Sequence, residues 1–497
     1  MLRTTLATAL PIRVVRNTPL AIGVYDALVA MFPTVDLPAA QGVGPTSPEV
    51  RGQLVACARK LLARWPSRAA PGPNGSRFEH WGAVTQDEES WEDAARVVVM
   101  FALGECSRDF LEANLGARIF ALRKPNGKLR PIACGSVLRH LAARTLCMHN
   151  KEDIRQACGE YQFAVGRHAG CELVHKTISA LTCASPQDVV LKFDCSNAFN
   201  TMPRQLILDA VQQRAPGLMP TVMAWLSQRT THFYWGEGRT ASPIHATRGV
   251  DQGCPLSPAL FAIGLAAALE YIQSSLVALA PSSRVFSYLD DIIVVVPAAV
   301  GESALDAVVR TLEGVCLTVN AGKTTAWTLD PSTALPARLQ GLRKDRCEVL
   351  GAMAPWLDAD GDFSRVGVHS LTNGVSVVDS ARAFVTKVVE LRGAGLSAKG
   401  AFLLLRAFSQ GHVTHLLRSN HECGDWAKQF DEILLRGLEH LVGLPMSMDQ
   451  RAQCFMRLSD GGLGFGSAGG GQGALLCLSL GWAAVWWEWI GWYCLCP

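Results

Sequence analysis

Tyr288-Leu289-Asp290-Asp291 lies between two apolar, β-prone runs, Val285-Phe286-Ser287 before it and Ile292-Ile293-Val294-Val295-Val296 after it. The pattern predicts a strand, a tight turn and a second strand, with both carboxylates at the tip. Two acids at a turn between buried strands repel each other and resist burial unless positive charge lies nearby. Because Mg2+ takes oxygen ligands, a divalent ion is a natural partner. The competing interpretation is an Asp-Asp turn selected for turn propensity alone.

A third carboxylate, Asp194, follows the apolar run from Val189 to Phe193, which predicts another strand. Two strands that end side by side would bring Asp194 to Asp290. Carboxylates on adjacent strand ends can hold two Mg2+ ions, of which one activates an attacking 3′-hydroxyl and the other neutralises leaving pyrophosphate. An acid at a strand end is, taken alone, more often a cap or a local hydrogen-bond acceptor, so this interpretation depends on the other segments.

Two further segments have suitable chemistry. Gly249-Val250-Asp251-Gln252-Gly253-Cys254-Pro255-Leu256-Ser257-Pro258 predicts an irregular loop before an apolar helix, roughly residues 258–274. Residues 118–130 contain five basic side chains and no acid around the turn Pro125-Asn126-Gly127, which predicts a basic hairpin. Such a hairpin can close over a triphosphate, since Arg makes bidentate phosphate contacts. The alternative is a solvated basic face.

Together these segments resemble the reverse transcriptases. The order Phe-Asp…Ala-Phe, Gln-Gly-Cys-Pro-Leu-Ser-Pro and Tyr-Leu-Asp-Asp looks like palm motifs A, B and C of that family. The resemblance covers about residues 70–470 and is closest to the non-LTR retrotransposon polymerases. Further segments resemble motif D, motif E, the fingers hairpin and two thumb segments, respectively Val319–Thr324, Val349–Ala352, Leu122–Ile132, Arg406–Arg418 and Asp460–Phe465.

The resemblance implies which residues bind metal. Asp194 and Asp290 match the family's metal ligands, and Asp291 matches a less certain one. The backbone carbonyl of Cys195 is expected to complete one metal shell. The implied cofactor is a pair of Mg2+ ions, with Mn2+ as a substitute, and no small-molecule cofactor is expected.

The resemblance also implies which residues bind the nucleotide. Lys124 and Arg130 are expected at the triphosphate, and Gln252 at the incoming nucleotide or the template. Phe199 matches a steric gate that excludes the ribose 2′-hydroxyl, although a core Phe is the competing interpretation. Lys323 is expected to donate a proton to pyrophosphate as a general acid, the alternative being a solvated lysine in a turn.

The expected fold class is α+β, a right-hand polymerase with fingers, a palm built on a ferredoxin-like antiparallel sheet, and a helical thumb. With 497 residues, the chain is long enough for several domains. The predicted divisions are an N-terminal extension, fingers, a palm with a fingers-like insertion at about 204–247, a helical thumb, and a Gly-rich break with an apolar tail, at residues 1–66, 67–188, 189–355, 356–468 and 469–497.

Composition limits the function classes. Charged residues make up 18% and hydrophobic residues 49%, which is typical of a globular protein, and the net charge of +3 requires any basic surface to be local. Sixteen Cys occur without a paired C-x-x-C, which favours a reducing compartment over a zinc site or a disulfide framework. Residues 474–496 contain five Trp and one charged residue, Glu488. The tail is long and apolar enough to contact a membrane, but the resemblance implies no membrane anchor.

The expected function is RNA-directed DNA polymerisation by two-metal phosphoryl transfer, as part of a retrotransposon-type element. The partners are an RNA template, a DNA or RNA primer and dNTPs. Two alternatives stay open: an inactive nucleic-acid-binding remnant, and an RNA-dependent RNA polymerase. The resemblance favours an intracellular, nuclear location.

Overall fold

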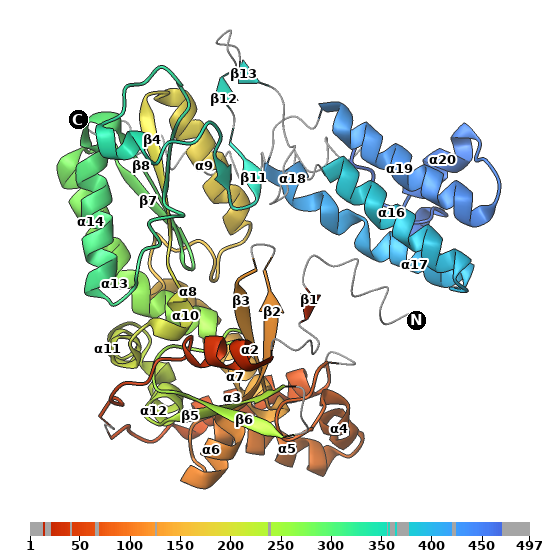
Figure 1. Cartoon of the computed structure of the whole chain (residues 1–497). Helices are drawn as coiled ribbons and strands as arrows, with labels where there is room; N and C mark the ends of the chain where they lie inside the picture. The colour runs from red at the N-terminus through yellow and green to blue at the C-terminus, as the bar shows by residue number, and fades with distance from the viewer. Residues whose placement is uncertain are drawn as a thin grey trace.

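The structure is a computed structural model of the chain, and it describes ten stretches of residues. These are residues 13–14, 21–39, 42–64, 69–124, 127–236, 240–354, 356–357, 363–364, 377–419 and 424–469. The apolar tail and the first twelve residues therefore lie outside the described residues. The α+β class is confirmed, since helices pack against antiparallel sheets (Figure 1). The predicted domain boundaries remain predictions.

The palm sheet has four antiparallel strands in the order β7 (Arg284–Tyr288), β8 (Asp291–Pro297), β4 (Asp188–Asp194) and β9 (Thr325–Thr328). Side chains alternate between its two faces, as the period of a strand requires. Val294 and its alternate neighbours join the core beneath α13 (Ser257–Leu279) and α14 (Gly301–Gly314). Val295 and the opposite set pack with α9 (Gly170–Ala184). Both faces are covered, which explains the unbroken apolar runs in the sequence.

Helix α13 is longer than the sequence prediction of 258–274, which was therefore wrong at its C-terminal end. The helix continues because Leu276 stays on the stripe that already carries Leu269 and Ile272, and all three side chains are buried. By length and composition α13 alone among the described helices could cross a membrane. Two thirds of its apolar 18-residue stretch is buried inside the protein, so α13 is a core helix.

A second sheet carries the basic hairpin. Strands β2 (Ala117–Arg123) and β3 (Leu129–Gly135) pair antiparallel over their whole length, which confirms the predicted hairpin. Strands β5 (Thr230–Trp235) and β6 (Ala241–Ala246) belong to the predicted insertion, and β5 pairs with β2 in parallel. The chain therefore leaves the palm after β4 and returns to the hairpin's sheet before it forms α13. Figure 1 shows the hairpin rising from this lower half of the molecule toward the palm.

Helices fill the space around the two sheets. Helix α2 (Ala21–Val29) covers one face of the hairpin sheet through Val24 and Leu28. The other elements of this half and of the palm periphery are β1 (Arg13–Val14), α3 (Pro48–Leu62), α4 (Phe78–Gly82), η1 (Ala83–Gln86), α5 (Glu88–Ala102), α6 (Arg108–Leu115), α7 (Val137–His149), α8 (Lys151–Ala157), α10 (Ala198–Thr201), α11 (Arg204–Arg214), η2 (Pro216–Leu218), α12 (Met219–Leu226), η3 (Ala298–Val300), α15 (Ala337–Gln340), β12 (Trp356–Leu357) and β13 (Phe363–Ser364).

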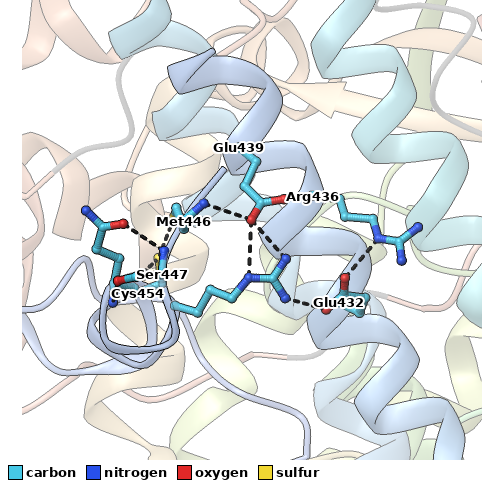
Figure 2. A network of polar contacts seen from close by, with 8 residues as sticks. Glu432, Arg436, Glu439, Met446, Ser447 and Cys454 are labelled. Carbon is cyan, nitrogen blue, oxygen red and sulfur yellow. Dashed lines mark hydrogen bonds and ion pairs between the residues drawn. The ribbon is translucent and has the colours of Figure 1, made fainter. Parts of the chain in front are cut away.

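The C-terminal helices form a separate group with its own core, centred on Phe430 and Leu405 (Figure 1). The group consists of α16 (Val377–Gly393), α17 (Ala398–Phe408), η4 (Gln410–His412), α18 (Thr414–Ser419), α19 (Gly424–Val442), α20 (Met448–Phe455) and η5 (Leu458–Asp460). Arg451 joins α20 to α19, because it donates to Glu432 and to Glu439, both at 2.9 Å. Figure 2 labels these two acceptors on α19. Glu439 also accepts from the Met446 amide at 3.0 Å, which fixes the loop between the helices.

One short hairpin connects this helical group to the palm. Strands β10 (Glu348–Val349) and β11 (Ala352–Met353) are joined by Leu350 and Gly351, both with positive φ, as a type I′ turn requires. His415 of α18 lies 2.9 Å from the Leu350 carbonyl oxygen. The segment that resembles motif E therefore contacts the C-terminal helices, next to the contact between α18 and α9.

Candidate active site

The register of the palm sheet gathers the predicted carboxylates. Asp194, the last residue of β4, lies directly opposite Asp291, the first residue of β8. Tyr288 pairs with Asp291 across the β7–β8 turn, so Leu289 and Asp290 are the two turn residues. The sequence prediction that strand ends bring these acids together is confirmed, and the structure adds that Asp291 is the direct cross-strand partner of Asp194.

The segment resembling motif D closes the other side of Asp194. The amide of Asn320 donates to the Asp194 carbonyl oxygen at 2.8 Å, and Cys195 pairs with Val319 in an isolated antiparallel bridge. This bridge uses the backbone groups of the neighbouring residues, so it leaves the Cys195 carbonyl oxygen out of the pairing. The loop then carries Lys323, whose Nζ donates to both carboxylate oxygens of Asp194 at 2.8 and 2.9 Å.

Burial and mutual repulsion govern the charges of the turn acids. Burial, and then the neighbouring Asp291, raise the pKa of Asp290 to about 6. Burial also raises the pKa of Asp291, against the opposing effect of Lys192. Part of Asp291 is nevertheless open to solvent, which screens the charge and weakens this effect of burial. An added cation beside such carboxylates would relieve both the repulsion and the cost of burial.

Asp194, Asp290 and Asp291 are the carboxylates of this site that could hold a metal ion. Within the described ranges no group of three or more His, Cys, Asp or Glu side chains is gathered tightly enough to hold an ion. The ammonium group of Lys323 occupies Asp194 instead. The chemistry of the set still fits a hard divalent cation, because Asp194, Asp290 and Asp291 are oxygen donors at adjacent strand ends and the pKa values of the last two are raised.

The basic hairpin lies across a cavity of about 880 Å³ from these acids. Lys124 and Arg130 line this cavity together with Asp194, Asp290 and Asp291. Burial, and then Arg130 and Lys323, lower the pKa of Lys124. The cavity is therefore acidic at the strand ends and basic at the hairpin, the arrangement that a metal-bound triphosphate requires.

The loop resembling motif B forms a third wall. The Gln252 carbonyl oxygen accepts from the Ala133 amide of β3 at 2.7 Å, so the loop is attached to the hairpin sheet. Gly253 has φ +127°, and a Cβ there would lie 2.5 Å from the Ala133 carbonyl oxygen. Only glycine permits this approach. Gln252 lines the same cavity as the acids, and its predicted contact with nucleotide or template stays a prediction.

A buried ion pair supports that loop from behind. Asp251 is 6% exposed, and its carboxylate accepts from Arg139 of α7 at 2.6 Å. The His232 Nε2 atom lies 3.1 Å from the other carboxylate oxygen. Burial alone would raise the pKa of Asp251, but His232 and Arg139 hold it well below its ordinary value. The loop thus joins α7 to β5 through one ionised carboxylate.

Phe199, the predicted steric gate, lines the cavity, but its ring is also packed. Its ring stacks on Phe261 with a centroid separation of 4.6 Å and an interplanar angle of 6°. Asn197, which precedes it, has φ +53° and donates to the Met31 carbonyl oxygen at 2.7 Å. Met31 follows α2 and lines the cavity with Gly23, Val24 and Ala27.

The sequence reasoning missed three contributors to the site. It placed α2 in an extension before the polymerase, yet this helix forms part of the cavity wall. It did not identify Arg139, which supports the Gln252 loop, or Gln162, whose amide contacts the catalytic turn. Of these three, Gln162 alone could have been identified from the sequence. It is a polar residue between Tyr161 and Phe163, and this position suggests a buried hydrogen-bonding role.

Comparisons with known proteins agree with this geometry. A family model described as Reverse transcriptase (RNA-dependent DNA polymerase) matches residues 122–354. The Retrotransposable element SLACS 132 kDa protein of Trypanosoma brucei gambiense is 28% identical over 413 residues, which cover 82% of this chain. The chain spans about a third of that relative's length, 33%.

Solved structures give more distant similarities. A telomerase from Candida albicans, solved with a fragment of telomeric RNA, has a TM-score of 0.37 and 12% identity, over 66% of this chain and 64% of that one. An apo telomerase from Candida tropicalis has a TM-score of 0.38 and 10% identity, over 66% and 63%. The family match begins near the end of β2 and includes Lys124, Arg130, all three carboxylates and the Gln252 loop, and the retrotransposon relative covers most of the chain. Over residues 122–354 the chain is therefore similar to the reverse transcriptases, and over most of its length it is similar to a retrotransposon protein.

Proposed function

We propose that this chain is an RNA-directed DNA polymerase that adds dNMPs to a primer 3′-hydroxyl on an RNA template. The observation that carries the proposal is the shared cavity, in which Asp194, Asp290 and Asp291 face the basic hairpin residues Lys124 and Arg130. Acids on one wall and cations on the other are what phosphoryl transfer from a triphosphate needs, because negative charge must be neutralised on both sides of the reacting phosphorus.

Divalent metal ions are generally used by reverse transcriptases, and we propose two Mg2+ ions here, with Mn2+ as a substitute. Asp194, Asp290, Asp291 and the Cys195 carbonyl oxygen would hold them. When bound, the ions would lower the pKa of the primer hydroxyl and neutralise the pyrophosphate. The remaining chemistry belongs to this chain's own side chains.

Four side chains would act on the nucleotide and its triphosphate. Arg130 and Lys124 would bind the triphosphate oxygens from the hairpin, and Gln252 would contact the incoming nucleotide or template from the loop attached to the hairpin sheet. Lys323 would donate a proton to departing pyrophosphate. Its ammonium group has to leave the Asp194 carboxylate, 2.8 Å away, before it can do so.

The proposed partners are a nucleic acid template and primer, with RNA as template, DNA or RNA as primer, and dNTPs as substrates. An intracellular, nuclear location is proposed with them. Imaging of the tagged full chain tests the location, and exclusion from the nucleus would contradict it.

One assay separates the proposed function from its alternatives. The full chain is given an RNA template, an annealed primer, Mg2+ and either dNTPs or NTPs. Template-directed extension with dNTPs alone supports the proposal. Extension with NTPs would identify an RNA-dependent RNA polymerase, and binding of template–primer without any extension would identify an inactive remnant.

Phe199→Ala is expected to admit ribonucleotides. If the ring occupies the space of a 2′-hydroxyl, its removal raises kcat/KM for NTPs, while dNTP use falls less than about tenfold, or roughly 1.4 kcal/mol. Side-by-side NTP and dNTP incorporation measures this.

The stacking on Phe261 defines the competing outcome. If Phe199 is only a core residue, Phe199→Ala loses about 3–5 kcal/mol of stability, and both activities fall together. Phe199→Val, which keeps part of the packing, serves as the control for stability. Unchanged sugar selectivity in a folded Phe199→Ala variant would remove Phe199 from the site.

A further inference from the structure

Gln162 is a fully buried polar residue that contacts the catalytic turn. Its side chain is 0% exposed, and the extended segment around it adds to the edge of β7 through a parallel bridge to Ser287. Backbone hydrogen bonds of 2.8 Å run from Phe163 to Ser287 and from Ser287 to Tyr161. Gln162 is therefore fixed beside the last residues of β7, just before the two turn residues.

Every interaction of the Gln162 amide stabilises this corner. Its Oε1 atom accepts from the Leu289 amide at 2.9 Å and from the Ala164 amide at 3.1 Å. Its Nε2 atom donates to Ser287 Oγ at 3.0 Å, and that hydroxyl donates to the Leu289 carbonyl oxygen at 2.8 Å. Both backbone groups of Leu289 are thus engaged by side chains that meet at Gln162.

Leu289 needs this support because of its conformation. Its φ of +56° lies in the left-handed region, which disfavours residues other than glycine by roughly 1–2 kcal/mol. A turn of this kind persists where its surroundings over-determine it. If the Leu289 peptide relaxed, the next residue, Asp290, would be displaced from the strand end that it shares with Asp291 and Asp194.

We propose that Gln162 is a positioning residue for the polymerase reaction, whose buried amide holds the Leu289 turn so that Asp290 and Asp291 face the cavity. The inference rests on the proposed function for its kinetic consequence, but its structural part does not. The amide neither touches the substrate nor reacts.

Gln162→Leu tests this, since Leu is of similar size and lacks the amide. We expect the single-turnover rate of dNMP addition to fall about tenfold or more, with KM for dNTP within about twofold, because small misplacements of catalytic groups cost rate rather than binding. Hydrogen exchange by mass spectrometry should become faster in the peptide that contains the Leu289 amide.

The chain offers a matched control in Gln273. This residue is also buried, 7% exposed, and it bonds the opposite end of β7 through Ser283 and Val285, at 3.0 and 2.8 Å. Gln273→Leu should lower the melting temperature comparably while the addition rate stays within about twofold. An equal loss of rate in both variants would reduce Gln162 to a generic strand support.

Ser287→Ala provides a second route, because it removes one link of the corner and leaves the backbone ladder intact. It should change the rate and the exchange of Leu289 in the same direction as Gln162→Leu, by less. If Gln162→Leu does not fold, the test rests on Ser287→Ala. A Ser287→Ala protein with the wild-type addition rate and wild-type exchange at Leu289 would overturn the inference. If the wild-type protein extends no primer, the proposed function fails. Hydrogen exchange at the Leu289 amide in the variants then decides alone whether Gln162 holds the turn.

Discussion

Asp290→Asn is expected to lower primer extension by about a thousandfold or more, equivalent to roughly 4 kcal/mol of transition-state stabilisation, with template–primer affinity within about twofold. Asn keeps the size and one oxygen of the side chain but loses the negative charge that a divalent ion needs. Asp194→Asn should behave in the same way. Single-turnover extension and a binding titration in parallel measure both quantities.

A thermal melt of the metal-free protein separates a loss of catalysis from a loss of folding. Because the folded-state pKa of Asp290 is raised to about 6, its ionisation favours the unfolded chain, and this cost develops as the pH rises from about 4 to about 6. The metal-free Asp290→Asn protein should therefore melt no lower than the wild type at neutral pH. Any gain in its melting temperature over the wild type should shrink below about pH 4, where both proteins are uncharged at position 290.

Asp188 supplies the matched control for this prediction. It begins β4, the strand that Asp194 ends, and it lies opposite Pro297 at the far edge of the same strand pair. Asp188→Asn makes the same chemical change at the wrong end of the sheet and should extend primers at the wild-type rate. Substantial extension by Asp290→Asn in Mg2+ would overturn the assignment of the site.

The parts of the site that the sequence could predict are those encoded locally. A turn between two apolar runs, a strand that ends at Asp194 and a basic hairpin each follow from residues within about ten positions, because side-chain period and turn chemistry act at that range. The structure contains all three elements near the predicted positions.

The parts that could not be predicted depend on long-range packing. Nothing in Gly23-Val24 or Met31 distinguishes a helix that lines a polymerase cavity from any other apolar helix, and the contact of Met31 with Asn197 spans 166 positions. The direct pairing of Asp194 with Asp291 depends on strand register, which the alternation of apolar residues cannot fix when both faces of a sheet are buried. The bond of Lys323 to Asp194 likewise follows from tertiary placement of its loop.

The role of Arg139 also depends on long-range packing, and its replacement is the second change for which we expect a large effect. Arg139→Met should destabilise the protein by roughly 3–5 kcal/mol, because it removes the guanidinium that is hydrogen-bonded to the buried Asp251 carboxylate and leaves that charge incompletely compensated. The variant should melt about 5–15 °C lower, given that 1 kcal/mol corresponds to a few degrees in a domain of this size. A thermal melt of the full chain measures the shift. Removal of both charges, in Arg139→Met/Asp251→Asn, should recover part of the loss, since a neutral pair avoids the uncompensated ion.

The same ion pair predicts a pH window and a consequence for activity. The pKa of Asp251 is depressed in the folded state, so its contribution is complete above the ordinary carboxylate value of about 4 and is lost only as the pH falls further. Arg51, whose pair with Glu105 is solvent-exposed, is the control, and Arg51→Met should cost less than about 1 kcal/mol. Because Asp251 directly precedes Gln252, Arg139→Met should also raise KM for dNTP at temperatures where the variant is folded. Equal melting of the Arg139→Met and Arg51→Met proteins would show that the buried carboxylate finds its compensation elsewhere, and the support assigned to Arg139 would then be wrong.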